Sequence, residues 1–182
     1  MSKLPKFIEG LVKDGKLKNS IDRDIKVDWP WTKIAGPCSG EGGPGDKFNI
    51  IDIAKSVKKM GANALRGGAY KPCTYPVTNS TSVGTYSWKE GLRVEGLKLL
   101  NLAKKETGLP IVTEIMHTSQ LDDETLDIVD VIQVGTRNAQ NYDLLDALGH
   151  IDKPVLLKRG LYGQIEDILG ACERIMVGGN HK

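Results

Sequence analysis

Five short apolar runs, each followed by an amphipathic segment, alternate along most of this chain. The runs predicted as strands are residues 33–36, 64–66, 110–114, 129–134 and 154–159. The segments predicted as helices are residues 48–60, 90–107, 122–128, 141–148 and 165–176. Strands that alternate with helices form a parallel sheet through right-handed crossovers. The sequence therefore predicts an α/β fold, either an open doubly wound sheet or part of a (β/α)8 TIM barrel.

Side chains that can take part in chemistry follow every predicted strand. In chain order they are Cys38, then Arg66 with Lys71, Glu114, Arg137, and Lys158 with Arg159. In a doubly wound sheet the binding residues gather at one switch point, whereas in a barrel they converge from all the strands. Five such strand ends in succession favour the barrel, of which this chain carries five βα units.

Composition and charge limit the partners and the location that we expect. Residues 1–32 are lysine-rich and weakly patterned, so we interpret them as an N-terminal extension of a barrel domain at residues 33–182. A net charge of +2 gives no reason to expect a nucleic-acid partner. The sequence shows neither an apolar stretch long enough for a membrane nor the apolar core of a secretory signal. The three cysteines include no C-x-x-C pair, which fits reduced thiols in a cytoplasmic protein.

Up to five cations would meet at the carboxyl ends of the strands. They are Arg66, Lys71, Arg137, Lys158 and Arg159. Buried charges need partners, and a ligand with more than one phosphate or carboxylate would supply them, with Arg as a bidentate clamp and Lys as a point charge. Gly67 and Gly68 would let such a ligand approach the backbone closely. The alternative is that each cation pairs with a neighbouring Asp or Glu.

Cys38 and Glu114 each allow more than one role. A Cys38 thiolate could be a metal ligand or a nucleophile, although a lone cysteine is more often a small buried apolar side chain. Glu114 could hold a water, act as a base or make an outer contact to a metal, and its alternative is an ion pair with an arginine. His117 is predicted to be a surface side chain.

Four segments at strand ends carry a resemblance to one enzyme family. They are IAGPCS at residues 34–39, LRGGAYKP at 65–72, QVGTRN at 133–138 and PVLLKRG at 154–160. Together they resemble the 3-deoxy-D-arabino-heptulosonate 7-phosphate (DAHP) synthases of the short type I branch. That branch is related to the 3-deoxy-D-manno-octulosonate 8-phosphate (KDO8P) synthases.

The resemblance implies a (β/α)8 barrel that condenses phosphoenolpyruvate with erythrose 4-phosphate, the first step of the shikimate pathway and of aromatic amino acid biosynthesis. It also implies a divalent metal ion, Mn²⁺ or similar, that polarises the aldehyde. Cys38 matches the family's cysteine metal ligand, and Lys71 and Glu114 fall near the reacting centre. Residues matching the phosphoenolpyruvate site are Arg66, Lys71, Arg137 and Lys158. Pro72 and Thr74 belong to a Lys-Pro-Arg-Thr motif that binds the sugar phosphate.

Two departures from the family lead to further expectations. The arginine of that motif is Cys73 here, and the family's barrel continues through three more βα units that carry the remaining metal ligands. We therefore expect an incomplete active site that a homo-oligomer or a complementing segment completes. The alternatives are a non-catalytic module that binds phosphoenolpyruvate or another anion, and condensation with a different phosphorylated aldose, as in KDO8P synthases.

Overall fold

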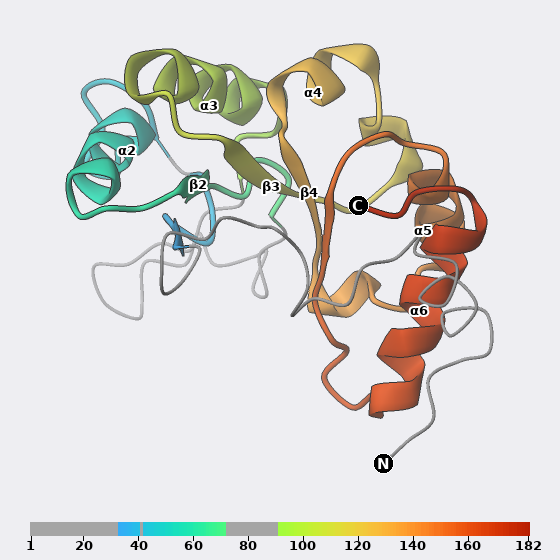
Figure 1. Cartoon of the computed structure of the whole chain (residues 1–182). Coiled ribbons are helices and arrows are strands. Elements are labelled where there is room, and N and C mark those ends of the chain that lie inside the picture. Colours follow the sequence, from blue (N-terminus) through green and yellow to red (C-terminus); the bar gives the residue numbers. More distant parts are fainter. Residues whose placement is uncertain (1–32, 41, 72–90) are drawn as a thin grey trace, which may run out of the picture. The chain divides into compact units, whose positions relative to one another are not determined.

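Strands and helices alternate in the computed structural model, which describes residues 33–40, 42–71 and 91–182 (Figure 1). The strands are β1 (Ile34–Ala35), β2 (Ala64–Arg66), β3 (Ile111–Ile115), β4 (Val131–Val134) and β5 (Val155–Leu157). The helices are α2 (Ile50–Lys59), α3 (Arg93–Thr107), α4 (Asp123–Ile128), α5 (Tyr142–Gly149) and α6 (Ile165–Val177), with the 3-10 helices η1 (Thr118–Gln120) and η2 (Thr136–Asn138). The predicted N-terminal extension, residues 1–32, lies outside the described residues.

The order of the strands distinguishes between the two architectures that the sequence left open. The sheet has five strands in the order β1-β2-β3-β4-β5, and the pairings β1–β2, β2–β3 and β4–β5 are parallel. A doubly wound sheet reverses its strand order at a switch point, whereas a barrel adds each strand beside the preceding one. The fold is therefore of the (β/α)8 barrel type, with five βα units in this chain.

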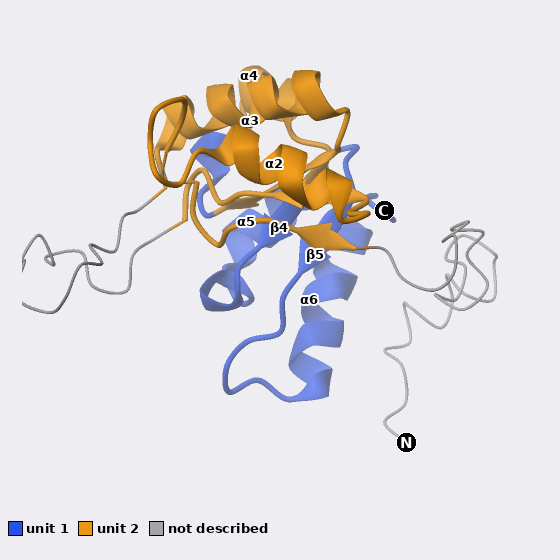
Figure 2. Cartoon of the chain, turned by 90° about the vertical axis from the view of Figure 1, so that its left-hand side faces the viewer, with its two compact units in different colours: residues 1–31, 116–120, 132–182 blue, residues 32–115, 121–131 orange. Residues whose placement is uncertain are grey.

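The chain divides into two compact units, each described here by itself (Figure 2). Unit 1 comprises residues 1–31, 116–120 and 132–182, and it contains β4, β5, α5 and α6. Unit 2 comprises residues 32–115 and 121–131, with β1, β2, β3, α2, α3 and α4. None of the described helices is both long and apolar enough to cross a membrane.

Unit 2 has its core between its strands and the helices α2 and α3, which pack against each other. All five residues of β3 are buried, as expected for a parallel strand covered on both faces. Helix α2 begins where the side chain of Asn49 accepts a hydrogen bond from the Ile51 amide at 3.0 Å. Helix α3 ends at Gly108, whose φ of 70° is the left-handed conformation of a C-terminal glycine cap.

Unit 1 is held together by the packing of α5 against α6. The fully buried side chains of α5 are Leu144, Leu145 and Leu148. Asn180 ties the end of α6 to the rest of the unit, because its amide donates to the carbonyls of Leu148 and Lys153 at 3.0 Å. All three residues of β5 are half-buried, in contrast to the buried strand β3 of unit 2.

The observed elements differ from the predicted ones mainly at their ends. Strands β4 and β5 are shorter than predicted, since residues 129–130, 154 and 158–159 lie outside them. The helix predicted at residues 141–148 corresponds to α5, which ends at Gly149 as expected. The short helices η1 and η2 were not predicted. Residues 90–92 also precede the observed start of α3.

Two helical glycines provide a matched pair for testing the packing of α5 on α6. A Cβ at Gly149 would lie 2.8 Å from the Ile175 carbonyl oxygen and 2.9 Å from the Gly178 Cα. A Cβ at Gly170, in α6, would have no atom within 4 Å. We expect Gly149→Ala to lower the free energy of unfolding by about 1–3 kcal/mol through overpacking, and Gly170→Ala to raise it by about 0.5–1 kcal/mol. Urea unfolding measures both, and equal effects would contradict this packing.

Candidate functional site

The ends of β1 and β2 approach each other closely through a glycine. Gly36 has a φ of +141°, and a Cβ there would lie 2.0 Å from the carbonyl oxygen of Arg66. Only glycine tolerates this contact. Since residue 36 is a glycine, the backbone after β1 can pack against the end of β2, and Cys38 lies beside Arg66. The Nη2 of Arg66 donates a hydrogen bond to the Cys38 Sγ at 3.6 Å. The Cys38 thiol is exposed, so it is not the small buried apolar side chain that the sequence also allowed.

The loop at residues 67–71 continues from β2 and carries Lys71. A Cβ at Gly68 would lie 2.4 Å from the Cys38 carbonyl oxygen and 2.7 Å from the Lys71 Cβ. The absence of a side chain at Gly68 therefore lets the backbone of Cys38 and the stem of Lys71 lie against it. The Gly40 amide also donates to the Gly68 carbonyl at 3.0 Å. Cys38, Arg66 and Lys71, three of the predicted site residues, thus cluster in unit 2.

The start of α3 also holds this loop in place. The Gly91 amide donates to the Lys71 carbonyl at 3.1 Å, and the Arg93 amide donates to the Ala69 carbonyl at 2.7 Å. A Cβ at Gly91 would lie 2.1 Å from the Ala69 carbonyl oxygen, so the contact requires glycine. Arg93 has a φ of 54°, the only positive value of a non-glycine residue among the described residues. The strained backbone of Arg93 accompanies its short bond to the loop.

Glu114 and His117 lie at and beyond the end of β3. Glu114 is only 5% exposed, one residue before the strand ends at Ile115. A buried carboxylate that is ionised requires partners, and a buried position near a strand end suits a group that holds a proton or a water. His117 is exposed, as predicted, and its Nδ1 lies 2.8 Å from the Ser119 hydroxyl.

Arg137 and Lys158 belong to unit 1, where each follows the carboxyl end of its strand. Arg137 lies in η2 directly after β4, and Lys158 is the first residue after β5. The Lys158 amide donates to the Val134 carbonyl at 3.1 Å, so the β4–β5 pairing extends to this lysine. Both side chains are exposed. The Nη1 of Arg159 donates to the Gly163 carbonyl at 2.8 Å within its own loop.

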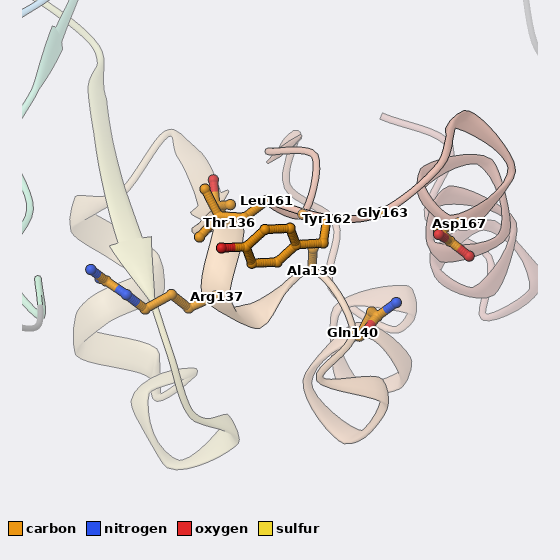
Figure 3. A pocket seen from close by; sticks show the side chains of 9 residues that line it. Thr136, Arg137, Ala139, Gln140, Leu161, Tyr162, Gly163 and Asp167 are labelled. Carbon is orange, nitrogen blue, oxygen red and sulfur yellow. The ribbon is translucent and has the colours of Figure 1, made fainter.

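A pocket of about 300 Å³ lies between η2 and the loop that follows β5 (Figure 3). Its lining includes Thr136, Arg137, Gln140, Tyr162 and Asp167. In Figure 3 the guanidinium of Arg137 points away from the Tyr162 ring. Sequence reasoning identified only Arg137 among these residues. For Tyr162, the sequence offered one signal, an apolar Leu161-Tyr162 pair between Gly160 and Gly163. In the structure the Tyr162 side chain is 98% exposed.

The remaining predicted site residues lie outside the described residues. They are Pro72 and Thr74, and Cys73 lies between them. The predicted roles of all these residues, and of Cys38, Arg66, Lys71, Glu114, Arg137 and Lys158, stay predictions.

A divalent metal ion requires several side-chain ligands around one point, and the described residues do not provide them together. Among them, no group of three or more His, Cys, Asp or Glu side chains is arranged to hold a metal. The exposed thiol of Cys38 is a suitable soft ligand, but a single ligand does not form a metal site. The part of the chain that the structure describes therefore offers no complete set of metal ligands.

Comparisons with known proteins show what the chain is similar to. The model of the "DAHP synthetase I family" matches residues 17–182. The "Phospho-2-dehydro-3-deoxyheptonate aldolase" of Thermotoga maritima is 40% identical over 160 residues, covering 87% of this chain and 43% of the relative. The "2-dehydro-3-deoxyphosphooctonate aldolase" of Syntrophotalea carbinolica is 30% identical over 153 residues, covering 84% of this chain and 52% of the relative.

A solved structure is similar as well. The crystal structure of the T. maritima DAHP synthase superposes with a TM-score of 0.68 at 38% sequence identity, covering 84% of this chain and 40% of that chain. This chain thus spans about half the length, or less, of the relatives that it matches.

The exposure of the cysteines leads to a test of the Cys38 environment. Cys172, in α6, is half-buried, and burial raises the pKa of its thiol, which lowers the thiolate fraction at pH 8. In a Cys73→Ser background, we expect iodoacetamide to alkylate Cys38 at least about tenfold faster than Cys172. Peptide mass spectrometry measures the two rates, and the Cys38→Ser variant identifies the fast site. Equal rates would contradict the exposed position of Cys38.

Proposed function

We propose that this chain, which belongs to the DAHP synthetase I family, forms the phosphoenolpyruvate-binding part of an enzyme that condenses phosphoenolpyruvate with erythrose 4-phosphate. The main support is the cluster of Cys38, Arg66 and Lys71 at the ends of β1 and β2, where Arg66 contacts the Cys38 thiol at 3.6 Å. In a barrel of this type the ligand binds at the carboxyl ends of the strands. The cluster therefore lies where the reaction of the family would take place.

Phosphoenolpyruvate carries a phosphate and a carboxylate, and the cations at the strand ends suit both groups. Arg66 and Arg137 would each bind one anionic group through paired N–H donors, while Lys71 and Lys158 would add point charges. Close backbone packing at Gly68, where a Cβ would lie 2.4 Å from the Cys38 carbonyl oxygen, holds the loop between Arg66 and Lys71. These two cations could therefore act on the same ligand.

Lys71 and Glu114 are the residues that we assign to the chemistry itself. Lys71 would donate a proton or a hydrogen bond to the oxygen of the aldehyde as the new carbon–carbon bond forms. Glu114, 5% exposed, would hold the water required when the phosphate leaves. A divalent ion such as Mn²⁺ would polarise the aldehyde in the complete enzyme, and Cys38 would be one of its ligands.

The identity of the aldehyde and of the partner belongs to the proposal too. Pro72 and Thr74 would contact the sugar phosphate, and Cys73 removes one cation from that motif. The alternative acceptor is a different phosphorylated aldose. It is supported by relatives named 2-dehydro-3-deoxyphosphooctonate aldolase, which are 30–33% identical to this chain. The remaining metal ligands would come from a complementing segment or from a second copy of the chain. We place the enzyme in the cytoplasm, without a nucleic-acid or membrane partner.

A second candidate function is phosphoenolpyruvate binding without catalysis. It is favoured by one observation, namely that the described residues form no group of three potential metal ligands. Such a module would keep Arg66, Lys71, Arg137 and Lys158 and would need no aldehyde. Both candidate functions predict phosphoenolpyruvate binding, but only the first predicts catalytic turnover.

Titration calorimetry with phosphoenolpyruvate tests the binding that both candidates share. We expect Arg66→Ala and Arg137→Ala each to weaken binding by at least about tenfold, because a hydrogen bond to a charged group contributes roughly 1.5–3 kcal/mol. Arg174→Ala is the control, since Arg174 forms a salt bridge with Asp146 at 2.5 Å in the α5–α6 packing. Unchanged affinity in both strand-end variants would refute the proposed clamp.

A phosphate-release assay separates catalysis from binding alone. With phosphoenolpyruvate, erythrose 4-phosphate and Mn²⁺, we expect the purified 182-residue chain to release phosphate only after a complementing segment is added, since the described residues form no group of three potential metal ligands. The T. maritima relative serves as the positive control. Turnover by the chain alone would contradict the proposed incompleteness, and continued inactivity with the segment would favour the non-catalytic module.

A further inference from the structure

Strand β2 ends before the loop that carries Lys71. The backbone hydrogen bonds that pair β2 with β3 end near the same point. Leu65 pairs with Ile111 and Arg66 with Val112 in parallel register. The Gly67 amide makes one more bond of this kind, to the Val112 carbonyl at 3.0 Å. Beyond Gly67 the backbone turns away from β3, so further ladder bonds would be lost.

The side chain of Thr113 takes over where this backbone ladder stops. Its hydroxyl donates a hydrogen bond to the Gly67 carbonyl at 2.7 Å and accepts one from the Ala69 amide at 3.0 Å. A hydroxyl has a single proton to donate, and here it is used on Gly67. Thr113 is 0% exposed, as is Ala69, so water does not compete for these two bonds. One side chain of β3 therefore holds the residues on both sides of Gly68.

Glycine pairs are conformationally free unless other groups hold them. Backbone bonds from remote segments also reach this loop. The amides of Gly40, Arg93 and Gly91 donate to the carbonyls of Gly68, Ala69 and Lys71 at 3.0, 2.7 and 3.1 Å. The Thr113 side chain connects residues 67 and 69 of the loop to β3 through both of its hydrogen bonds. Its position sets the path of the chain from Arg66 to Lys71.

We infer that Thr113 is a positioning residue, whose hydroxyl fixes residues 67–69 so that Arg66 and Lys71 are presented together to a doubly anionic ligand. The inference rests on the proposed function for the identity of that ligand. Valine has nearly the shape of threonine but can make neither bond, so Thr113→Val would leave a buried carbonyl and a buried amide unpaired. Serine keeps the hydroxyl and should preserve the loop.

The chain offers a matched control in Thr125 of α4. Thr125 is 1% exposed, and its hydroxyl has no hydrogen-bond partner within the described ranges. Thr125→Val therefore makes the same chemical change at an equally buried site, without removing a bond to the loop. Any effect that Thr113→Val shares with Thr125→Val does not come from positioning.

Amide hydrogen exchange, followed by NMR on the full chain, measures the loop without any ligand. We expect Thr113→Val to speed the exchange of the Ala69 amide by at least about tenfold, relative to the Leu65 amide, which donates to the Pro110 carbonyl at 2.9 Å. Thr113→Ser and Thr125→Val should keep the wild-type ratio. A uniform increase at both amides, or no increase at Ala69, would overturn the inference.

Calorimetry with phosphoenolpyruvate then tests the consequence for binding. We expect Thr113→Val to weaken binding by about tenfold, Thr113→Ser to restore it, and Thr125→Val to leave it unchanged. If the wild type binds and Thr113→Val binds equally well, the inference is wrong while the proposed function stands. If the wild type does not bind, the proposed function is wrong, and the exchange of Ala69 still decides whether Thr113 fixes the loop.

Thr113→Ser keeps the test decisive if Thr113→Val does not fold. Retention of the hydroxyl predicts wild-type exchange at Ala69 and wild-type affinity, even though one methyl group is lost from a buried site. Loss of either property in a folded Thr113→Ser protein would overturn the inference.

Discussion

Close backbone contact between β1 and β2 is the constraint on which the candidate site depends. A side chain at Gly36 would come within 2.0 Å of the Arg66 carbonyl oxygen, so the two strands can meet only because residue 36 is a glycine. The contact brings Cys38 beside Arg66, at 3.6 Å. The same kind of contact recurs at Gly68 and Gly91, where a Cβ would lie 2.4 and 2.1 Å from a neighbouring carbonyl oxygen. The site residues of unit 2 are thus placed by backbone packed on backbone.

The stability of the fold and the geometry of the candidate site depend on different interactions. The apolar core of unit 2, which includes Leu65 and Ile111, is buried beneath the strand ends and can form whatever the loop at residues 67–71 does. The loop is held by hydrogen bonds from Gly40, Arg93 and Thr113. Each such bond contributes only about 1 kcal/mol to stability, yet together they decide where Lys71 lies. Loss of one bond should therefore affect ligand binding more than folding.

The sequence predicted the elements well because their signals are local. Apolar runs and terminal glycines such as Gly108 depend on a few neighbouring residues. The contact of Cys38 with Arg66 was predicted only as a convergence of strand ends, because its geometry depends on the register of β1 against β2. Thr113 was not recognised at all, since its hydroxyl acts on Gly67 and Ala69, and no spacing in the sequence distinguishes it from an ordinary strand threonine.

Anion binding and metal binding place different demands on a chain of this length. A cation such as Lys158 needs only its own strand end to be in place, and β5 provides it although all three of its residues are half-buried. A metal site needs several ligands within about 2–2.3 Å of one point, so it requires elements that are fixed relative to one another. Among the described residues, cations follow β2, β4 and β5, whereas no group of three potential metal ligands is present. On the proposed function, anion binding therefore requires less of the fold than the metal site that the condensation would need.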